Sequence, residues 1–135
     1  LNKNGKILTI DKDKEKNIIA KNFFKKANVL NKIKTEVSSG NDALIKLIKN
    51  KKKYDLILID ADKENYINYF DKSLKLLNKN GLLIVDNILW KGEVTNINSK
   101  DKLTKKIKIF NQHVKKSKIN KYILPIGDGF YICWK

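Results

Sequence analysis

Short apolar runs typical of β-strands alternate with longer segments of helical period, and this alternation limits the possible folds more than any other feature of the chain. The spacing of apolar residues predicts strands at 7–10, 33–37, 54–59 and 82–85, and helices at 14–28, 42–49, 64–77 and 102–117. Two further runs, 122–126 and 130–134, flank Gly127-Asp128-Gly129 and predict an antiparallel hairpin. This order predicts an α/β fold, with a mostly parallel sheet, helices on both sides and the hairpin at its end.

Several local signals refine this prediction. Asn78-Lys79-Asn80-Gly81 predicts a helix exit and a turn, because Asn and Gly adopt left-handed backbone conformations readily. Residues 82–85 are apolar without alternation, which predicts a strand covered on both faces. Asp128 is interpreted first as a turn residue, with a role in a site left open, and His113 as a solvent-facing side chain that binds no metal. No repeat or Pro-rich linker divides the chain, so a single domain over 1–135 is expected.

The composition excludes several classes of protein. Hydrophobic residues make up 41% of the 135 residues, which is enough for a core. No apolar run approaches the roughly 18 to 20 residues of a membrane span, so no membrane partner is expected. The single cysteine, Cys133, cannot form an internal disulfide and excludes zinc sites built on several cysteines. We expect a reducing, cytoplasmic setting and a buried Cys133 that serves as a small hydrophobic residue.

The charge raises the question of nucleic acid. Thirty lysines, no arginine and 14 acidic residues give a formal charge of +16, and lysines neutralise phosphates. The lysines are spread along the chain with only Lys51-Lys52-Lys53 as a local run, and arginine, the residue that contacts guanine in bidentate fashion, is absent. A solvated basic surface is therefore the favoured interpretation, and RNA as a substrate stays open.

Acidic and amide side chains follow three of the predicted strands. These residues are Asp11, Asp60, and Asp86 with Asn87. Ligands of α/β sheets bind beyond the carboxyl ends of the strands, although a lone Asp there is more often a turn or helix-cap residue. Asp11 by itself suits the hydroxyls of a ribose. Its structural alternative is to cap the helix that begins at Lys14.

The other three residues suggest a metal site. If the strands 54–59 and 82–85 are neighbours, their ends lie about 4.8 Å apart. Asp60, Asp86 and Asn87 could then share one hard cation such as Mg²⁺, which prefers oxygen ligands at about 2.1 Å.

Three segments resemble the cation-dependent O-methyltransferases, the group that includes the caffeoyl-CoA and catechol enzymes and their bacterial relatives. They are 54–66, which contains Asp60-Ala61-Asp62-Lys63, 81–92, which contains Asp86-Asn87 and Trp90, and 124–129. The resemblance covers nearly the whole chain in the right order. It implies a Rossmann-like fold of the class I methyltransferases that depend on S-adenosylmethionine.

The resemblance also implies roles for individual residues. Asp60, Asp86 and Asn87 look like the ligands of a divalent metal, with Mg²⁺ as the expected ion. The residues implied to bind S-adenosylmethionine are Asp11 at the ribose, Asp42 and Ala43 at the adenine, and Asp60 and Asp62. Lys63 matches the lysine beside the metal, and Lys63 and Asp60 are the implied catalytic residues. Asp60 and Trp90 are implied to contact the substrate.

The implied reaction is transfer of a methyl group from S-adenosylmethionine to a hydroxyl of a small catechol-like or phenolic acceptor, whose two oxygens would bind the metal. Lys63 would accept the hydroxyl proton or stabilise the oxyanion. Two alternatives stay open. One is methylation of a hydroxylated uridine of tRNA, which the positive charge would favour, and the other is a partial domain without catalytic activity.

Two features depart from the family pattern. Leu1 falls just before what corresponds to the family's second strand, so we expect that the first strand, the glycine-rich loop around the methionine end of the cofactor and the N-terminal helices are missing. An incomplete sheet follows, with a gap between the strands that end at Asp11 and Asp60, together with weak or no cofactor binding by this chain and a homodimer only in the full-length protein. Lys91 follows Trp90 where plant enzymes for hydroxycinnamoyl thioesters carry another polar residue, which argues against that acceptor.

Overall fold

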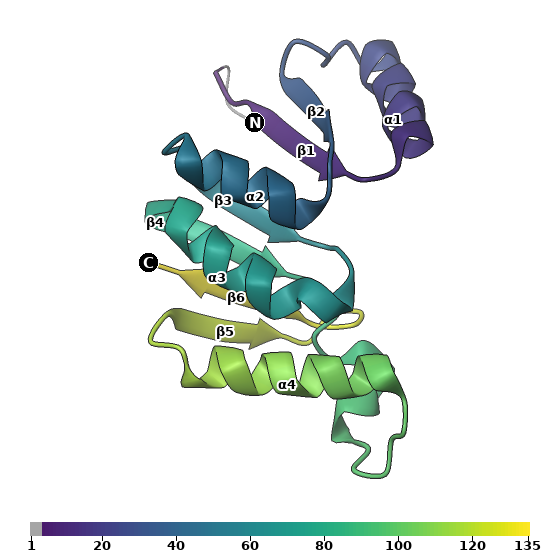
Figure 1. Ribbon diagram of the computed structural model, residues 1–135, viewed down its shortest axis with the longest axis vertical. Helices are drawn as coiled ribbons and strands as arrows, with labels where there is room; N and C mark the ends of the chain where they lie inside the picture. Colours follow the sequence, from purple (N-terminus) through teal and green to yellow (C-terminus); the bar gives the residue numbers. More distant parts are fainter. Residues whose placement is uncertain (1–3) are drawn as a thin grey trace. The chain divides into compact units, whose positions relative to one another are not determined.

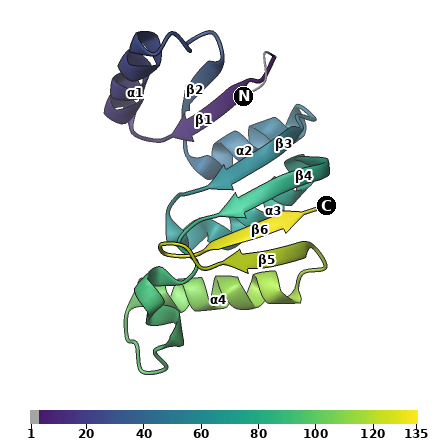
Figure 2. The same cartoon turned by 180° about the vertical axis from the view of Figure 1, so that it is seen from behind.

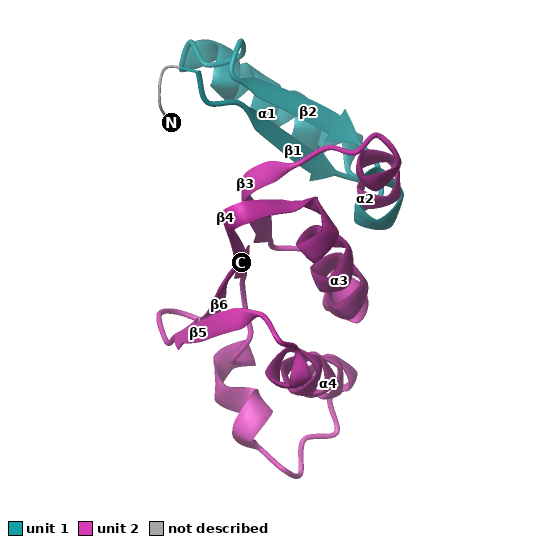
Figure 3. Cartoon of the chain, turned by 90° about the vertical axis from the view of Figure 1, so that its left-hand side faces the viewer, with its two compact units in different colours: residues 1–43 teal, residues 44–135 magenta. Residues whose placement is uncertain are grey.

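The computed structural model describes residues 4–135, and these divide between Ala43 and Leu44 into two compact units (Figure 3). The first unit contains a two-stranded sheet and the second a four-stranded sheet. The single domain expected over 1–135 stays a prediction. Leu1, on which the expectation of a missing first strand rests, lies outside the described residues.

The first unit is a β-α-β segment. Strand β1 (Ile7–Asp11) is followed by helix α1 (Lys14–Lys26) and strand β2 (Ile33–Val37). The two strands pair in parallel, with Ile7 opposite Ile33 and Asp11 opposite Val37. The first turn of α2 (Gly40–Lys49) also belongs to this unit. Helix α1 ends slightly before the predicted end, and α2 begins slightly before its predicted start.

Asp13 fixes the start of α1. Its Oδ1 accepts hydrogen bonds from the backbone N–H groups of Glu15 at 2.9 Å and Lys16 at 3.1 Å, which is the arrangement of an N-cap. The alternative interpretation, in which Asp11 caps the helix that begins at Lys14, is therefore wrong. The Oδ1 atom of Asp11 instead accepts the backbone N–H of Asp13 at 2.9 Å.

The second unit is built on a sheet with the strand order β3-β4-β6-β5 (Figure 1). Strand β3 (Tyr54–Ile59) pairs in parallel with β4 (Leu77–Val85), and β6 (Phe130–Trp134) pairs antiparallel with both β4 and β5 (Asn120–Leu124). The predicted hairpin is thus confirmed. Parallel strands connected through helices and finished by an antiparallel pair also confirm the predicted α/β class.

Two helices follow short 3₁₀ segments in this unit. Helix α3 (Tyr66–Leu76) comes directly after η1 (Lys63–Asn65), and α4 (Lys102–Lys116) comes after η2 (Trp90–Thr95). Asp101 caps α4, because its Oδ2 accepts the Thr104 backbone N–H at 2.6 Å, and this hydrogen bond lowers the pKa of Asp101. None of the helices described between residues 4 and 135 is long and apolar enough to cross a membrane.

Within residues 44–135 the helices lie on one face of the sheet, and no helix of this unit covers the other face (Figures 1 and 2). Leu83 and Val85 of β4 point toward the helices and are fully buried. The alternate residues Leu82 and Ile84 are only half-buried and lie opposite Leu56 and Leu58 of β3, which are exposed. The expectation of helices on both sides, and of 82–85 covered on both faces, is therefore wrong for this unit.

Residues 78–81 belong to β4 and do not form the predicted turn. The strand begins at Leu77, directly after α3, and its register with β3 jumps from Tyr54–Leu77 to Leu56–Leu82. Asn80 absorbs part of this irregularity with a φ of 63°. Gly81 leaves room for the chain to approach itself, because a Cβ there would lie 2.9 Å from the carbonyl oxygen of Asn78. The sequence thus predicted a left-handed residue in this segment, but it did not distinguish a bulge within a strand from a turn.

Candidate active site

The carboxyl ends of β3 and β4 are neighbours, as the predicted metal site requires. Ile59 pairs with Val85, and the Asp86 backbone N–H donates to the Ile59 carbonyl at 3.0 Å. Asp60 follows Ile59 in the chain, and Asp86 and Asn87 follow Val85. The structure therefore brings these three residues to one edge of the sheet.

Lys63 lies at the centre of this edge. Its side chain is only 10% exposed, whereas that of Asp60 is 63% exposed. The ammonium nitrogen lies 2.6 Å from Asn87 Oδ1, 2.5 Å from Tyr66 Oη and 3.6 Å from Asp60 Oδ1. It also lies 5.9 Å from the centre of the Trp90 ring. This lysine is therefore held by the predicted site residues and differs from the many lysines on the surface.

The oxygen atoms around Lys63 fit a cation. One positive charge already contacts an oxygen of Asn87 and one of Asp60, and Asp86 Oδ1 accepts the Asn87 backbone N–H at 2.6 Å, which orients its carboxylate. Two carboxylates and an amide match the ligands of hard cations such as Mg²⁺. Residues 4–135 contain no cluster of three or more His, Cys, Asp and Glu side chains suited to a metal, so the amide of Asn87 would have to be the third protein ligand.

Tyr66 was not singled out as a site residue by the sequence. It is fully buried, and its hydroxyl donates to the Asp86 backbone carbonyl at 3.1 Å while accepting from Lys63. Burial, followed by the carboxylates of Asp60, Asp86 and Asp62, raises the pKa of Tyr66 above its ordinary value, and a hydrogen bond to the backbone of Ala61 opposes this shift. The phenol therefore stays protonated at neutral pH. Its place three residues after Lys63, at the end of the 54–66 segment, is the signal that could have found it.

The turn of the β5–β6 hairpin holds the segment that follows Asn87. The backbone N–H groups of Ile88 and Leu89 donate to the carbonyls of Gly129 at 3.1 Å and Asp128 at 2.8 Å. The Lys91 backbone N–H donates to Asp128 Oδ1 at 3.2 Å. Asp128 is thus more than the turn residue that the sequence predicts. Its backbone and side chain fix the segment that carries Trp90.

Asp62, the weaker of the predicted cofactor residues, lies in a different network. Its Oδ1 accepts the Tyr69 hydroxyl at 2.6 Å and its Oδ2 accepts the Asn65 amide at 2.5 Å. Burial, and then the hydrogen bond to Asp62, raise the pKa of Tyr69. The carboxylate is therefore fixed in position by the start of α3.

The remaining predicted cofactor residues belong to the first unit. Asp11 ends β1 and bonds to the backbone of Asp13. Asp42 lies in the first turn of α2, where Ser39 Oγ donates to its Oδ2 at 2.7 Å, and Ala43 is almost completely buried. The binding roles of these residues stay predictions.

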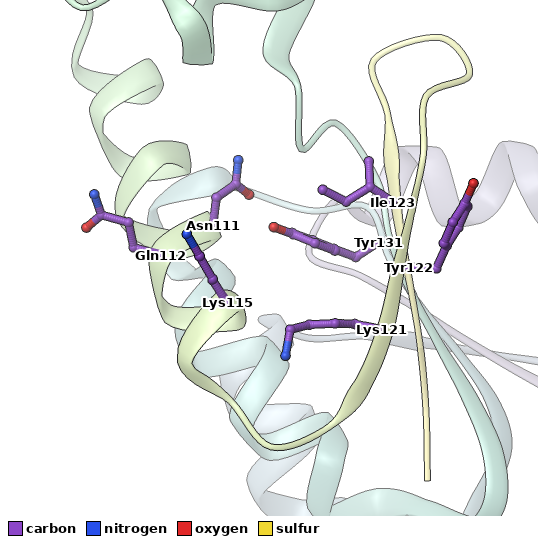
Figure 4. Close-up of a pocket in the computed structure, with 7 residues that line it drawn as sticks. All are labelled: Asn111, Gln112, Lys115, Lys121, Tyr122, Ile123 and Tyr131. Atoms are coloured by element: carbon purple, nitrogen blue, oxygen red, sulfur yellow. The ribbon is translucent and has the colours of Figure 1, made fainter.

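Other features of the second unit lie outside this edge. An open groove between α4 and β5 contains none of the predicted site residues; it is lined by Asn111, Gln112, Lys115, Lys121, Tyr122, Ile123 and Tyr131, with Tyr122 on the far side of the strand (Figure 4). His113 is partly exposed, as predicted, and its Nε2 lies 2.8 Å from Asp71 Oδ1. Cys133 is fully buried, as predicted, and burial raises the pKa of its thiol to about 11.

Known proteins match this chain over its whole length. Residues 1–135 fit the sequence profile of the O-methyltransferase family. The chain belongs to this family. Among the curated O-methyltransferases and their relatives, it is 34% identical to a flavonoid 3',5'-methyltransferase of Vitis vinifera and 33% identical to caffeoyl-CoA O-methyltransferase 5 of Nicotiana tabacum. These alignments cover 98% and 96% of the chain but 61% and 58% of the relatives, so the chain spans about three fifths of their length.

A solved O-methyltransferase gives the same result for the fold. The enzyme from Bacillus cereus, determined in complex with SAH, is 26% identical to this chain and superposes with a TM-score of 0.88. The match covers 100% of the chain and 65% of that enzyme. The family inferred from the Asp-Ala-Asp-Lys and Asp-Asn segments and the Rossmann-like methyltransferase fold are both confirmed.

Proposed function

We propose that the protein containing this chain transfers a methyl group from S-adenosylmethionine to a hydroxyl of a small catechol-like or phenolic acceptor, with a divalent cation, expected to be Mg²⁺. The observation that carries the proposal is the meeting of Asp60, Lys63 and Asn87 beyond two neighbouring parallel strands. Membership of the O-methyltransferase family supports the reaction class. The SAH bound to the Bacillus cereus enzyme supports the methyl donor.

The proposed roles follow from the contacts at the sheet edge. Asp60, Asp86 and Asn87 would hold the cation, which when bound supplies a Lewis acid that lowers the pKa of an acceptor hydroxyl. Lys63 directs its side-chain nitrogen to the same edge, where the neutral amine would take up the hydroxyl proton or the ammonium would stabilise the oxyanion. The Trp90 ring, 5.9 Å from the Lys63 nitrogen, bounds the place where an acceptor would lie.

The family resemblance also assigns residues to the methyl donor. We assign the ribose to Asp11, the adenine to Asp42 and Ala43, and further contacts to Asp60 and Asp62. The acceptor oxygen must attack the methyl carbon in line with the sulfur, so holding the two reactants in the correct orientation supplies much of the rate acceleration.

A hydroxylated uridine of tRNA is the second candidate acceptor. The formal charge of +16 supports it, because lysines that neutralise phosphates give a salt-dependent affinity for RNA. The third possibility is a domain without catalysis. We further propose a cytoplasmic protein that forms a homodimer at full length.

Methyl transfer from radiolabelled S-adenosylmethionine distinguishes these functions. The 135-residue chain and the complete coded protein that contains it are incubated with a catechol panel or with bulk tRNA, each with Mg²⁺ or with EDTA. Label in a catechol that disappears with EDTA is the expected result. Label in tRNA would support the tRNA alternative and refute a catechol acceptor. If the complete protein labels no acceptor, the non-catalytic alternative is supported.

Two pairs of variants test the residue roles in the active protein. Asp60→Ala and Lys63→Ala are each expected to lower kcat by about a hundredfold or more, the contribution typical of a positioned acid or base. Asp55→Ala, at the opposite end of β3, and Lys105→Ala, on the exposed side of α4, are the matched controls. Near-normal turnover by Asp60→Ala would refute the cation site.

A further inference from the structure

The buried phenol of Tyr66 touches the site without being assigned a part in the proposed reaction. Its oxygen lies 2.5 Å from the Lys63 nitrogen, and its ring centre lies 4.7 Å from the same atom. We propose that Tyr66 is a positioning residue, whose hydroxyl holds the Lys63 ammonium at the edge of the sheet occupied by Asp60, Asp86 and Asn87. The inference rests on the proposed function only in that methyl transfer would use Lys63.

The hydrogen bonds around Tyr66 define the direction of each donor. The phenol donates its single proton to the Asp86 backbone carbonyl at 3.1 Å, so its oxygen is left to accept from Lys63. The backbone of Ala61 also bonds to the phenol. The hydroxyl therefore connects Lys63 to the segments that leave β3 and β4, and both segments carry predicted cation ligands.

A lysine at this edge needs an acceptor that the cation does not use. The other acceptors of Lys63 are Asn87 Oδ1 at 2.6 Å and Asp60 Oδ1 at 3.6 Å, which are oxygens proposed to hold the cation. A lysine held only by these oxygens would compete with the cation or lose its fixed position when the cation binds. Tyr66 offers an oxygen outside the ligand set. The long lysine side chain loses much rotamer freedom when it is fixed. With Tyr66 it keeps a hydrogen-bond partner whether or not the cation is bound.

The ring of Tyr66 has a separate structural task. It packs edge-on against Phe110 with the ring centres 5.3 Å apart, and the residue is fully buried. Phenylalanine at position 66 would keep this packing and remove only the hydroxyl. Tyr66→Phe therefore separates the positioning role from the role of the ring in the core.

The test observes the lysine ammonium directly. Lysine side chains are labelled with ¹⁵N in the 135-residue chain, and the Lys63 ammonium resonance is assigned by its loss in Lys63→Met. We expect the Lys63 ammonium to exchange its protons slowly in the unmodified chain. Tyr66→Phe is expected to speed this exchange about tenfold, which corresponds to about 1.4 kcal/mol, close to the contribution of one charge-assisted hydrogen bond.

Tyr69→Phe is the matched control. Tyr69 is also buried on α3 and also loses one short hydrogen bond, but its partner is Asp62 rather than Lys63. Exchange of the Lys63 ammonium should stay within about twofold in this variant, since the lost bond is no part of the Lys63 network. If both variants speed exchange equally, Tyr66 acts only through general loosening of α3, and the proposal is wrong.

A reciprocal measurement covers the case in which Tyr66→Phe does not fold. The ¹³Cζ resonance of Tyr66 should shift in Lys63→Met while that of Tyr69 does not, and an unmoved Tyr66 resonance would overturn the contact.

Measurements of methyl transfer separate this proposal from the proposed function. In a complete protein that transfers methyl groups, Tyr66→Phe should lower kcat about tenfold and leave the KM for S-adenosylmethionine within about twofold. If Tyr66→Phe speeds proton exchange of the Lys63 ammonium but leaves kcat unchanged, the role of Tyr66 in the reaction is refuted. If the Lys63 ammonium exchanges slowly in a protein that transfers no methyl group, only the proposed function is refuted.

Discussion

Substitution of Gly129 by alanine should destabilise the segment that carries Trp90. Its φ is 75°, and a Cβ placed on it would lie 2.4 Å from Leu89 Cγ and 2.7 Å from Leu89 Cδ1. A left-handed backbone costs about 1–2 kcal/mol for a residue with a Cβ, and forcing an extra methyl group into a packed position costs about 1–3 kcal/mol. We therefore expect Gly129→Ala to lower the free energy of unfolding by about 2–5 kcal/mol.

Gly127→Ala is the matched control within the same turn. Its φ of 57° carries the same backbone penalty, but nothing lies within 4 Å of its Cβ. Urea unfolding followed by tryptophan fluorescence should show a loss of only about 1–2 kcal/mol for Gly127→Ala. The difference between the two variants measures the collision with Leu89.

A third variant makes the explanation refutable. Leu89→Ala removes the atoms that the new Cβ would meet, so Gly129→Ala should be less damaging in that background than alone. Because the Ile88 and Leu89 backbone N–H groups bond to the hairpin turn, Gly129→Ala should also disturb the environment of Trp90. Equal losses for Gly127→Ala and Gly129→Ala, or no relief by Leu89→Ala, would show that the reasoning about this contact is wrong.

Three further outcomes are expected. The hydrogen bond from the Thr104 backbone holds the pKa of Asp101 below its ordinary value of 3.8 in the folded chain, so its stabilisation is present above that value and is lost as the pH falls through the lower folded value; Asp101→Asn should flatten the acid limb of a stability–pH curve. Phe110→Ala, at a fully buried ring, should cost about 3–5 kcal/mol in urea unfolding, whereas Ile97→Ser, at a side chain that is 90% exposed, should stay within about 0.5 kcal/mol. Cys133, buried and with a thiol pKa of about 11, should react with Ellman's reagent at pH 8 only as fast as the chain opens; immediate reaction in the folded chain would contradict its burial.

Local patterns predicted most of the elements. The strands 33–37, 54–59 and 130–134 agree with the structure residue for residue, because short continuous or alternating apolar runs are typical of strands. The same patterns failed where a neighbour had to be known. Ile18, Ile19 and Phe23 recur at helical spacing, yet they are exposed on α1, since periodicity reports that a face is apolar and not what covers it.

Some residues of the candidate site could likewise be predicted from the sequence, and one could not. Asp60, Asp86 and Asn87 could be predicted because each follows an apolar strand, and Lys63 could be predicted because its segment resembles the family. The participation of Tyr66 depends on hydrogen bonds to residues 20 and 3 positions away in the chain, which exist only once β3 and β4 are paired.

By itself, the sequence determined the order of the elements, the hairpin, the family and the acidic edge of the sheet, because these depend on residue type and spacing along the chain. Only the tertiary structure decided that a buried phenol holds Lys63, that Asp128 and Gly129 fix the segment before Trp90, and that the helices within residues 44–135 cover one face of their sheet. Each of these features requires groups distant in the chain to meet, and strand pairing and helix packing determine which groups do.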